Sequence, residues 1–164
     1  MKNEAAARVF ASHYQLVICD DPTIFTEELN WRNGDFERGF AGNERFRMVG
    51  TEADLNDHWV EVRIVNDLPE LDAWQRVTCV SFQCITGHVH IMSILDNEPS
   101  ISLDLPNGNY AVYVAGSNLG VDQSSLGEYE KLTDTQLAHR KDVEWYQIFI
   151  VPGRPVREGR IKDE

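Results

Sequence analysis

The chain has 164 residues, of which 42% are hydrophobic, and this is enough for one domain spanning residues 1–164 with an ordinary core. Its 27 acidic and 15 basic residues give a formal net charge of -12, and a surface of that sign repels DNA, RNA and anionic membranes. No apolar run approaches the roughly 18 residues of a membrane span, so neither direct nucleic-acid binding nor membrane insertion is expected.

The first fifty residues predict short elements. The Ala-rich residues 1–11 form either a short helix or a loose end, and residues 12–19 alternate as a strand. Within 34–41, two phenylalanines lie four residues apart, which is helical spacing, so a short helix capped near a following glycine is expected there. Residues 45–49 fit a second strand.

The middle of the chain alternates apolar and polar residues with the period of half-buried strands. The predicted strands are 58–66, 74–85 and 88–95, and Thr86-Gly87 starts a hairpin-type turn between the last two. Two further strands, 100–105 and 109–116, are expected to form a hairpin across Pro106-Asn107-Gly108-Asn109.

The last third contains one strong strand, 143–151. A polar loop is expected over 117–141, where the pattern around 134–139 is compatible with a short helix. Residues 152–164 are rich in proline, glycine and arginine and are predicted to be a loose tail or an edge segment. These elements together predict an all-β fold. We expect an antiparallel β-sandwich of about eight strands, with jelly-roll-like or barrel-like closure as alternatives and one or two short helices.

The three cysteines exclude a complete set of disulfides. Cys79 and Cys84 are five apart on one predicted strand, so they face opposite sides and are not expected to bridge. The N-terminal sequence lacks the apolar region of a signal peptide. We therefore expect a cytoplasmic protein with reduced thiols.

His88 and His90 form a His-x-His pair, and on a strand both imidazoles face the same way. Jelly-roll metalloenzymes follow such a pair with a nearby glutamate, but here Ile91 to Leu95 contain no acid. The pair is a weak metal candidate, and two histidines on the wetter face of a strand is the preferred interpretation. Neither a Gly-x-Ser-x-Gly elbow nor a Gly-rich phosphate loop occurs, so no enzyme activity and no cofactor are predicted.

Acidic residues concentrate between positions 52 and 72, where Arg63 is the one lysine or arginine. Such a run is either a solvated surface or a site for a basic protein partner. The residues of this candidate site are Glu52, Asp54, Asp57, Glu61, Asp67, Glu70 and Asp72.

Four tryptophans in 164 residues leave a second function open. Aromatic side chains on a sandwich face stack on sugars, although most tryptophans are core residues. The alternative is thus a small-ligand or carbohydrate-binding β-sandwich, and its mark would be a concave apolar pocket that contains Trp59 or Trp74.

Three segments of the chain resemble the competence protein J (ComJ) family, the nuclease inhibitors (Nin) that partner a DNA-entry nuclease in naturally competent bacteria. They are Trp31 with Phe36 to Ala41, Val77 to Phe82 followed by Gly87 to Ile94, and Ser102 to Pro106 followed by Gly108 to Tyr110. The resemblance implies a non-enzymatic protein that binds and inhibits a basic nuclease or nuclease-like toxin.

Overall fold

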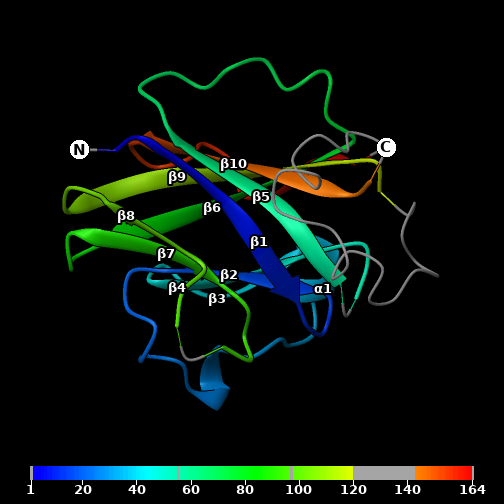
Figure 1. Ribbon diagram of the computed structural model, residues 1–164, viewed down its shortest axis with the longest axis horizontal. Helices are drawn as coiled ribbons and strands as arrows, with labels where there is room; N and C mark the ends of the chain where they lie inside the picture. The colour runs from blue at the N-terminus through cyan, green and yellow to red at the C-terminus, as the bar shows by residue number, and fades with distance from the viewer. Residues whose placement is uncertain (1, 55, 97, 120–142, 164) are drawn as a thin grey trace.

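Two β-sheets packed face to face make up the computed structural model, which describes residues 2–54, 56–96, 98–119 and 143–163 (Figure 1). The six-stranded sheet contains, in spatial order, β1 (Glu4–Ala11), β5 (Asn56–Ile64), β10 (Trp145–Pro152), β9 (Gly108–Ser117), β6 (Arg76–Cys84) and β11 (Gly159–Asp163). The five-stranded sheet contains β3 (Phe40–Asn43), β4 (Phe46–Gly50), β2 (Gln15–Cys19), β7 (His88–Met92) and β8 (Ile101–Asp104).

The predicted all-β sandwich is confirmed, with two short helical turns: the 3-10 turn η1 (Glu27–Leu29) and the helix α1 (Asp35–Arg38). The described residues form eleven strands rather than about eight, and β5 and β10 run parallel whereas the other neighbours are antiparallel. None of the helical elements among the described residues has the length and apolar character to cross a membrane. The short helix considered around 134–139 lies outside the described residues.

The core lies between the two sheets and follows the alternation that the sequence predicts. Val60 and Val62 of β5 are buried in it together with Val80, Phe82 and Cys84 of β6. The alternate residues of β6 face outward, and there Val77 packs in a second apolar cluster with Ala115 and Phe149.

An extended segment covers the outer face of each sheet. Residues 65–75, which we call the strap, arch across the top of Figure 1 and place Leu68, Leu71 and Trp74 on the outer cluster of the six-stranded sheet. Residues 24–31 do the same on the five-stranded sheet, where Phe25 packs against Phe46. Because both outer faces are covered, neither sheet presents a bare apolar surface.

The prediction of a short helix or a loose end is wrong for the N-terminus, whereas at the C-terminus the structure has the edge segment that was one of the two alternatives. Residues 4–11 form β1, paired with β5 from Glu4 opposite Arg63 to Ala11 opposite Asn56. Alternate residues of this strand, Val9 and Ala11, are fully buried. The alternation was hard to recognise in the sequence because alanine is only weakly hydrophobic. The expected tail ends in β11, which pairs with β6 through a register shift between Arg160 and Lys162.

The two predicted hairpins are also wrong, because each turn carries the chain from one sheet to the other. β6 and β9 belong to the six-stranded sheet, whereas β7 and β8 belong to the five-stranded sheet. The two crossings hold each other: the Gly87 N–H donates to Asn107 Oδ1 over 2.8 Å, and the Leu105 N–H donates to the Gly87 carbonyl over 2.9 Å. Tyr110 completes this corner by donating its hydroxyl to the Pro106 carbonyl.

Asp20 anchors the first of these crossings from the end of β2. Its side chain is fully buried and accepts hydrogen bonds from Arg45 Nε and the Ile85 N–H, each over 2.9 Å. The Asp20 carbonyl accepts a third bond, from the Thr86 hydroxyl, over 2.7 Å. One residue thereby joins β2, the β3–β4 turn and the β6–β7 crossing.

We predict that Asp20→Ala destabilises the protein by about 3 kcal/mol, because it leaves a partly buried N–H and a partly buried guanidinium without their acceptor. Urea unfolding followed by circular dichroism measures this difference. Asp104→Ala is the matched control, since it removes an exposed carboxylate and is expected to cost less than about 0.5 kcal/mol. Equal effects of the two substitutions would contradict the anchoring role.

Candidate partner-binding site

An open cleft of about 770 Å³ lies where η1, α1, the start of β2 and the end of β4 meet. Six of its fourteen lining residues are aromatic or aliphatic, and seven are polar or charged and come from several segments. The lining residues are His13, Tyr14, Gln15, Phe25, Glu27, Asn30, Trp31, Phe36, Gly50, Thr51, Glu52, Ile94, Leu95 and Arg160.

Trp31 and Phe36 form the aromatic wall of the cleft. Their ring centroids are 5.2 Å apart with an interplanar angle of 25°, so the rings are stacked. Trp31 Nε1 donates to Gln15 Oε1 over 2.7 Å, which fixes the indole. The short helix α1 contains Phe36 and is capped at its C-terminal end by Gly39. Gly39 has a φ of 87°, a left-handed conformation that glycine adopts without strain. Because Gly39 has no side chain, the side chain of Arg160 packs against it. The predicted helix capped at Gly39 is thus confirmed.

The turn between β1 and β2 forms another side of the cleft and is strained. His13 and Tyr14 have φ values of 60° and 59°, a left-handed conformation that non-glycine residues adopt uncommonly. Asp54 Oδ1 accepts the Tyr14 N–H over 3.2 Å, and the Tyr14 carbonyl accepts the Thr51 N–H over 2.8 Å. This turn makes the strand begin at Gln15 rather than at the predicted position 12, and it leaves Tyr14 exposed.

A chain of alternating charges runs from the cleft to the C-terminal strand. Glu52 accepts a hydrogen bond from Arg76 over 2.8 Å, Arg76 also donates to Asp163 over 3.1 Å, and Asp163 lies 3.5 Å from Arg160. Burial by itself lowers the pKa of Arg76, but its bonds to Glu52 and Asp163 outweigh this and raise the pKa above its ordinary value. β11 therefore contributes to the cleft through Arg160 and Asp163, a role that the sequence of β11 did not indicate.

A buried polar cluster supports the cleft from behind. Glu144 Oε2 accepts the Tyr146 hydroxyl over 2.7 Å and the Ala53 N–H over 3.2 Å, and it lies 3.4 Å from His58 Nε2. The Tyr146 oxygen in turn accepts the Glu52 N–H over 3.1 Å. Burial and the neighbouring Glu144 raise the pKa of Tyr146 well above its ordinary value. The cluster fixes the backbone of residues 52 and 53 beside the cleft.

The structure separates the predicted acidic site into two groups. The carboxylates of the first group, which lie nearer the cleft, contact other residues of the protein. Glu52 forms an ion pair with Arg76, Asp54 accepts a hydrogen bond from the Tyr14 N–H, and Asp57 lies 4.0 Å from Arg8. Glu61, on β5, accepts a hydrogen bond from Trp59 Nε1 over 3.3 Å. The second group is exposed on the strap and consists of Asp67, Glu70 and Asp72.

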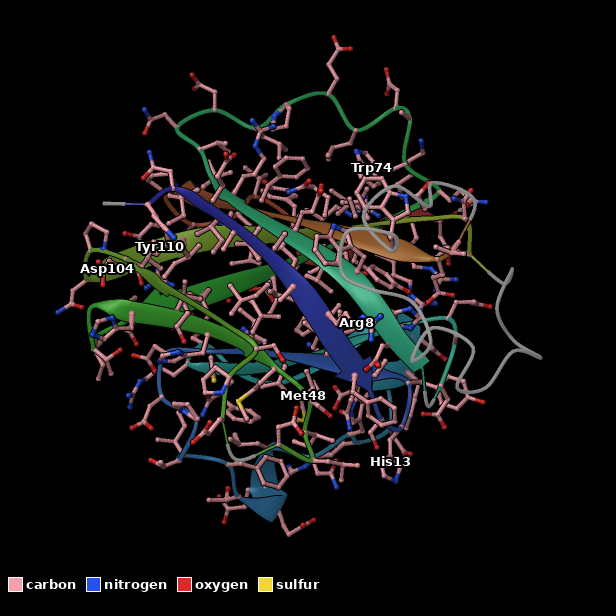
Figure 2. All side chains as sticks on the ribbon, in the orientation of Figure 1. Arg8, His13, Met48, Trp74, Asp104 and Tyr110 are labelled. Atoms are coloured by element: carbon pink, nitrogen blue, oxygen red, sulfur yellow. The ribbon has the colours of Figure 1, made fainter. Side chains whose placement is uncertain are left out.

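Hydrogen bonds fix the strap that carries this second group at both of its ends and at Asp72. The Val65 N–H donates to the Ile150 carbonyl over 3.0 Å, and the Gln75 N–H donates to the Gly116 carbonyl over 3.1 Å. Lys162 of β11 donates to the Asp72 carbonyl over 2.7 Å. The exposed carboxylates therefore project from a fixed backbone. In the view of Figure 2, the strap arches over the labelled Trp74 at the top and His13 lies near the bottom.

His88 and His90 share a face of β7, as predicted, but each has a neighbour on β8. His88 Nδ1 lies 3.2 Å from Asp104 Oδ1, and His90 Nδ1 lies 2.7 Å from the Ser102 hydroxyl oxygen. Burial and the nearby His88 lower the pKa of His90. Across residues 2–54, 56–96, 98–119 and 143–163, no three His, Cys, Asp or Glu side chains are grouped closely enough to hold a metal ion.

The tryptophans singled out for a ligand pocket do not line the cleft. Trp74 packs edge-on against Trp145, with ring centroids 5.0 Å apart, and Trp59 is half-buried on β5. The cleft contains Trp31 instead. Sequence reasoning missed Tyr14 and Phe36 as site residues, although the spacing from Trp31 to Phe36 belongs to a segment that carried the family resemblance.

The fold and the cleft define a two-sheet β-sandwich protein that exposes an aromatic cleft beside acidic segments. The model of the family described as Competence protein J (ComJ) matches residues 8–138, which is well over half of the chain. The chain therefore belongs to the competence protein J family.

Two solved structures share this fold. One is described as the crystal structure of ComJ, inhibitor of the DNA degrading activity of NucA, from Bacillus subtilis; it has a TM-score of 0.66 and 17% identity and covers 93% of this chain and 98% of its own. The other, Crocagin biosynthetic gene J, has a TM-score of 0.53 and 15% identity and covers 93% of this chain and 97% of its own. No curated protein sequence matches the chain.

The cysteines are free, buried and poor nucleophiles. Burial raises the pKa of Cys19 to about 12, with the charges of Asp20 and Asp21 adding to the effect. Burial also raises the pKa of Cys79 to about 11.

We predict that the native protein does not react with Ellman's reagent at about pH 8, because all three thiols are buried and burial also keeps Cys19 and Cys79 protonated. Unfolding in guanidinium chloride should release three reactive thiols per chain, one for each cysteine. Absorbance at the reagent's thiolate band gives both numbers. A thiol that reacts within seconds in the native protein would show that the described burial is wrong.

Proposed function

We propose that this protein binds a DNA-degrading nuclease and inhibits it, acting in the cytoplasm without catalytic activity or a cofactor of its own. The observation that carries the proposal is membership of the competence protein J family. The B. subtilis protein of similar fold, described as an inhibitor of the DNA degrading activity of NucA, supports the nuclease as the class of partner.

The charge of the chain supports the same partner. An enzyme that cleaves DNA holds a polyanion, so its binding groove is basic. A rigid protein with a formal net charge of -12 is attracted to such a groove and associates quickly under electrostatic steering. Salt screens this attraction, so the association rate should fall as ionic strength rises.

We propose that the acidic run from Glu52 to Asp72 contributes to partner binding, with its exposed half on the strap as the steering group. Asp67, Glu70 and Asp72 face solvent, whereas the carboxylates nearer the cleft also hold the local structure. A charge that faces solvent acts on an approaching partner without first breaking an internal contact.

We predict that the purified protein suppresses plasmid degradation by a DNA-degrading nuclease from the same source organism, with complete inhibition at about one inhibitor per nuclease. Agarose gels of plasmid treated with increasing inhibitor measure the effect. Heat-denatured protein is the control for charge alone. Undiminished degradation, together with no complex in analytical gel filtration, would overturn the proposed function.

We predict that the triple variant Asp67→Asn, Glu70→Gln, Asp72→Asn slows association with the nuclease about threefold to tenfold at low salt and leaves dissociation nearly unchanged. Surface plasmon resonance measures both rates. The matched control removes three exposed carboxylates outside the strap and the cleft through Glu4→Gln, Glu44→Gln and Asp104→Asn. If the two triple variants slow association equally, the strap has no special part in steering.

A further inference from the structure

Exposed apolar side chains gather at the cleft. Tyr14, Phe36 and Leu95, which line it, are 56%, 66% and 62% exposed. They are three of the five large hydrophobic residues that are exposed in the described part of the chain; the others are Ile85 and Val156. A concentration of exposed aromatic and aliphatic side chains around one hollow is typical of the centre of a protein interface.

The cleft is also rigid before anything binds to it. Gln15 fixes the indole of Trp31, Asp54 and Thr51 hold Tyr14 in its strained conformation, and the buried Glu144 cluster fixes the adjoining backbone. Holding exposed aromatic rings in place lowers the entropy that a partner must overcome on binding. Strain that the surrounding bonds maintain at one exposed position is a further mark of a functional surface.

The charged residues beside the cleft indicate which kind of partner side chain fits it. Residues 27–38, four of which line the cleft, contain four acids (Glu27, Glu28, Asp35 and Glu37) and two basic residues, Arg32 and Arg38. Arg38 pairs with Asp35, so the excess of negative charge on this rim comes from the three glutamates. Arg160, the cation inside the cleft, lies in an ion pair with Asp163. A partner side chain that enters beside Trp31 and Phe36 therefore meets apolar walls and an acidic rim, which suits an apolar residue next to a lysine or arginine.

We propose that this cleft is the anchoring site for the nuclease, receiving an apolar side chain of the nuclease that is flanked by a lysine or arginine; the inference rests on the proposed function. A small ligand fits less well, because ligand pockets enclose most of their ligand whereas Tyr14, Phe36 and Leu95 here stay more than half exposed. A second copy of this chain fits less well too, since it brings the same acidic rim.

Phe36→Ala and Leu95→Ala test the proposal in binding to the nuclease of the plasmid assay, by surface plasmon resonance and in that assay itself. Neither side chain belongs to the buried core, so both variants should fold, which circular dichroism and thermal melting verify. Each is expected to raise the dissociation rate at least about tenfold and weaken inhibition in proportion, with little change in association rate. Ile85→Ala and Val156→Ala remove exposed apolar side chains away from the cleft and should stay within about twofold of the wild type.

The outcomes separate the two proposals. If the wild type inhibits the nuclease but the cleft variants behave like Ile85→Ala, the cleft is not the anchor and the proposed function stands. If the wild type neither binds nor inhibits the nuclease, both proposals fail. A small molecule that co-purifies with the wild type in native mass spectrometry, and is lost in Phe36→Ala, would assign the cleft to a ligand instead.

Discussion

The fold depends on how the chain crosses between its two sheets at one corner. Two crossings lie side by side there, joined by the bonds between Gly87, Leu105 and Asn107, and Asp20 ties the first of them to β2. A crossing turn leaves backbone groups outside both sheets, and buried groups of this kind must find other partners. The carboxylate of Asp20 and the amide of Asn107 supply those partners, so the corner is specified by two polar side chains.

A buried arginine adds a second tie between the sheets. Arg47 of β4 donates through Nε to the Ser81 carbonyl of β6 over 2.9 Å and through Nη2 to the Ser81 hydroxyl over 2.8 Å. Burial lowers the pKa of Arg47, and its third donor, Nη1, reaches the Gly42 carbonyl over 3.2 Å. Because hydrogen bonds fix direction where apolar packing does not, the arginine sets how β4 lies against β6.

The sequence predicted where the strands lie better than which strands pair with each other. Alternation identified β5, β6, β7, β8, β9 and β10, since each has one face in the core. Whether a short turn folds a strand back on its neighbour or sends it to the opposite sheet depends on distant groups such as Asp20, which a local pattern does not contain. β1 escaped recognition because alanines make a weak apolar signal, and β11 because its arginine and lysine look like a solvated tail.

The cleft was harder still to predict, because its lining residues come from well-separated parts of the chain. Tyr14 gives no sequence signal of its left-handed backbone, which the bonds to Asp54 and Thr51 maintain. Arg160 reaches the cleft only because β11 adds to the edge of β6. The acidic run was visible in composition, but its division into a structural half and an exposed half depends on tertiary contacts with Arg76, Tyr14 and Arg8.

Those contacts bear on how an acidic protein achieves specificity. Several of its basic side chains form contacts within the protein. Arg45 pairs with Asp20, Arg76 pairs with Glu52 and Asp163, and Lys162 donates to backbone carbonyls of the strap. The positive charges therefore fix the fold, while carboxylates such as Asp67 and Glu70 remain exposed and supply the outward field. Such a field attracts any basic protein and cannot select one. Discrimination between basic partners then requires a feature of defined shape, which the stacked pair of Trp31 and Phe36 beside a strained Tyr14 provides.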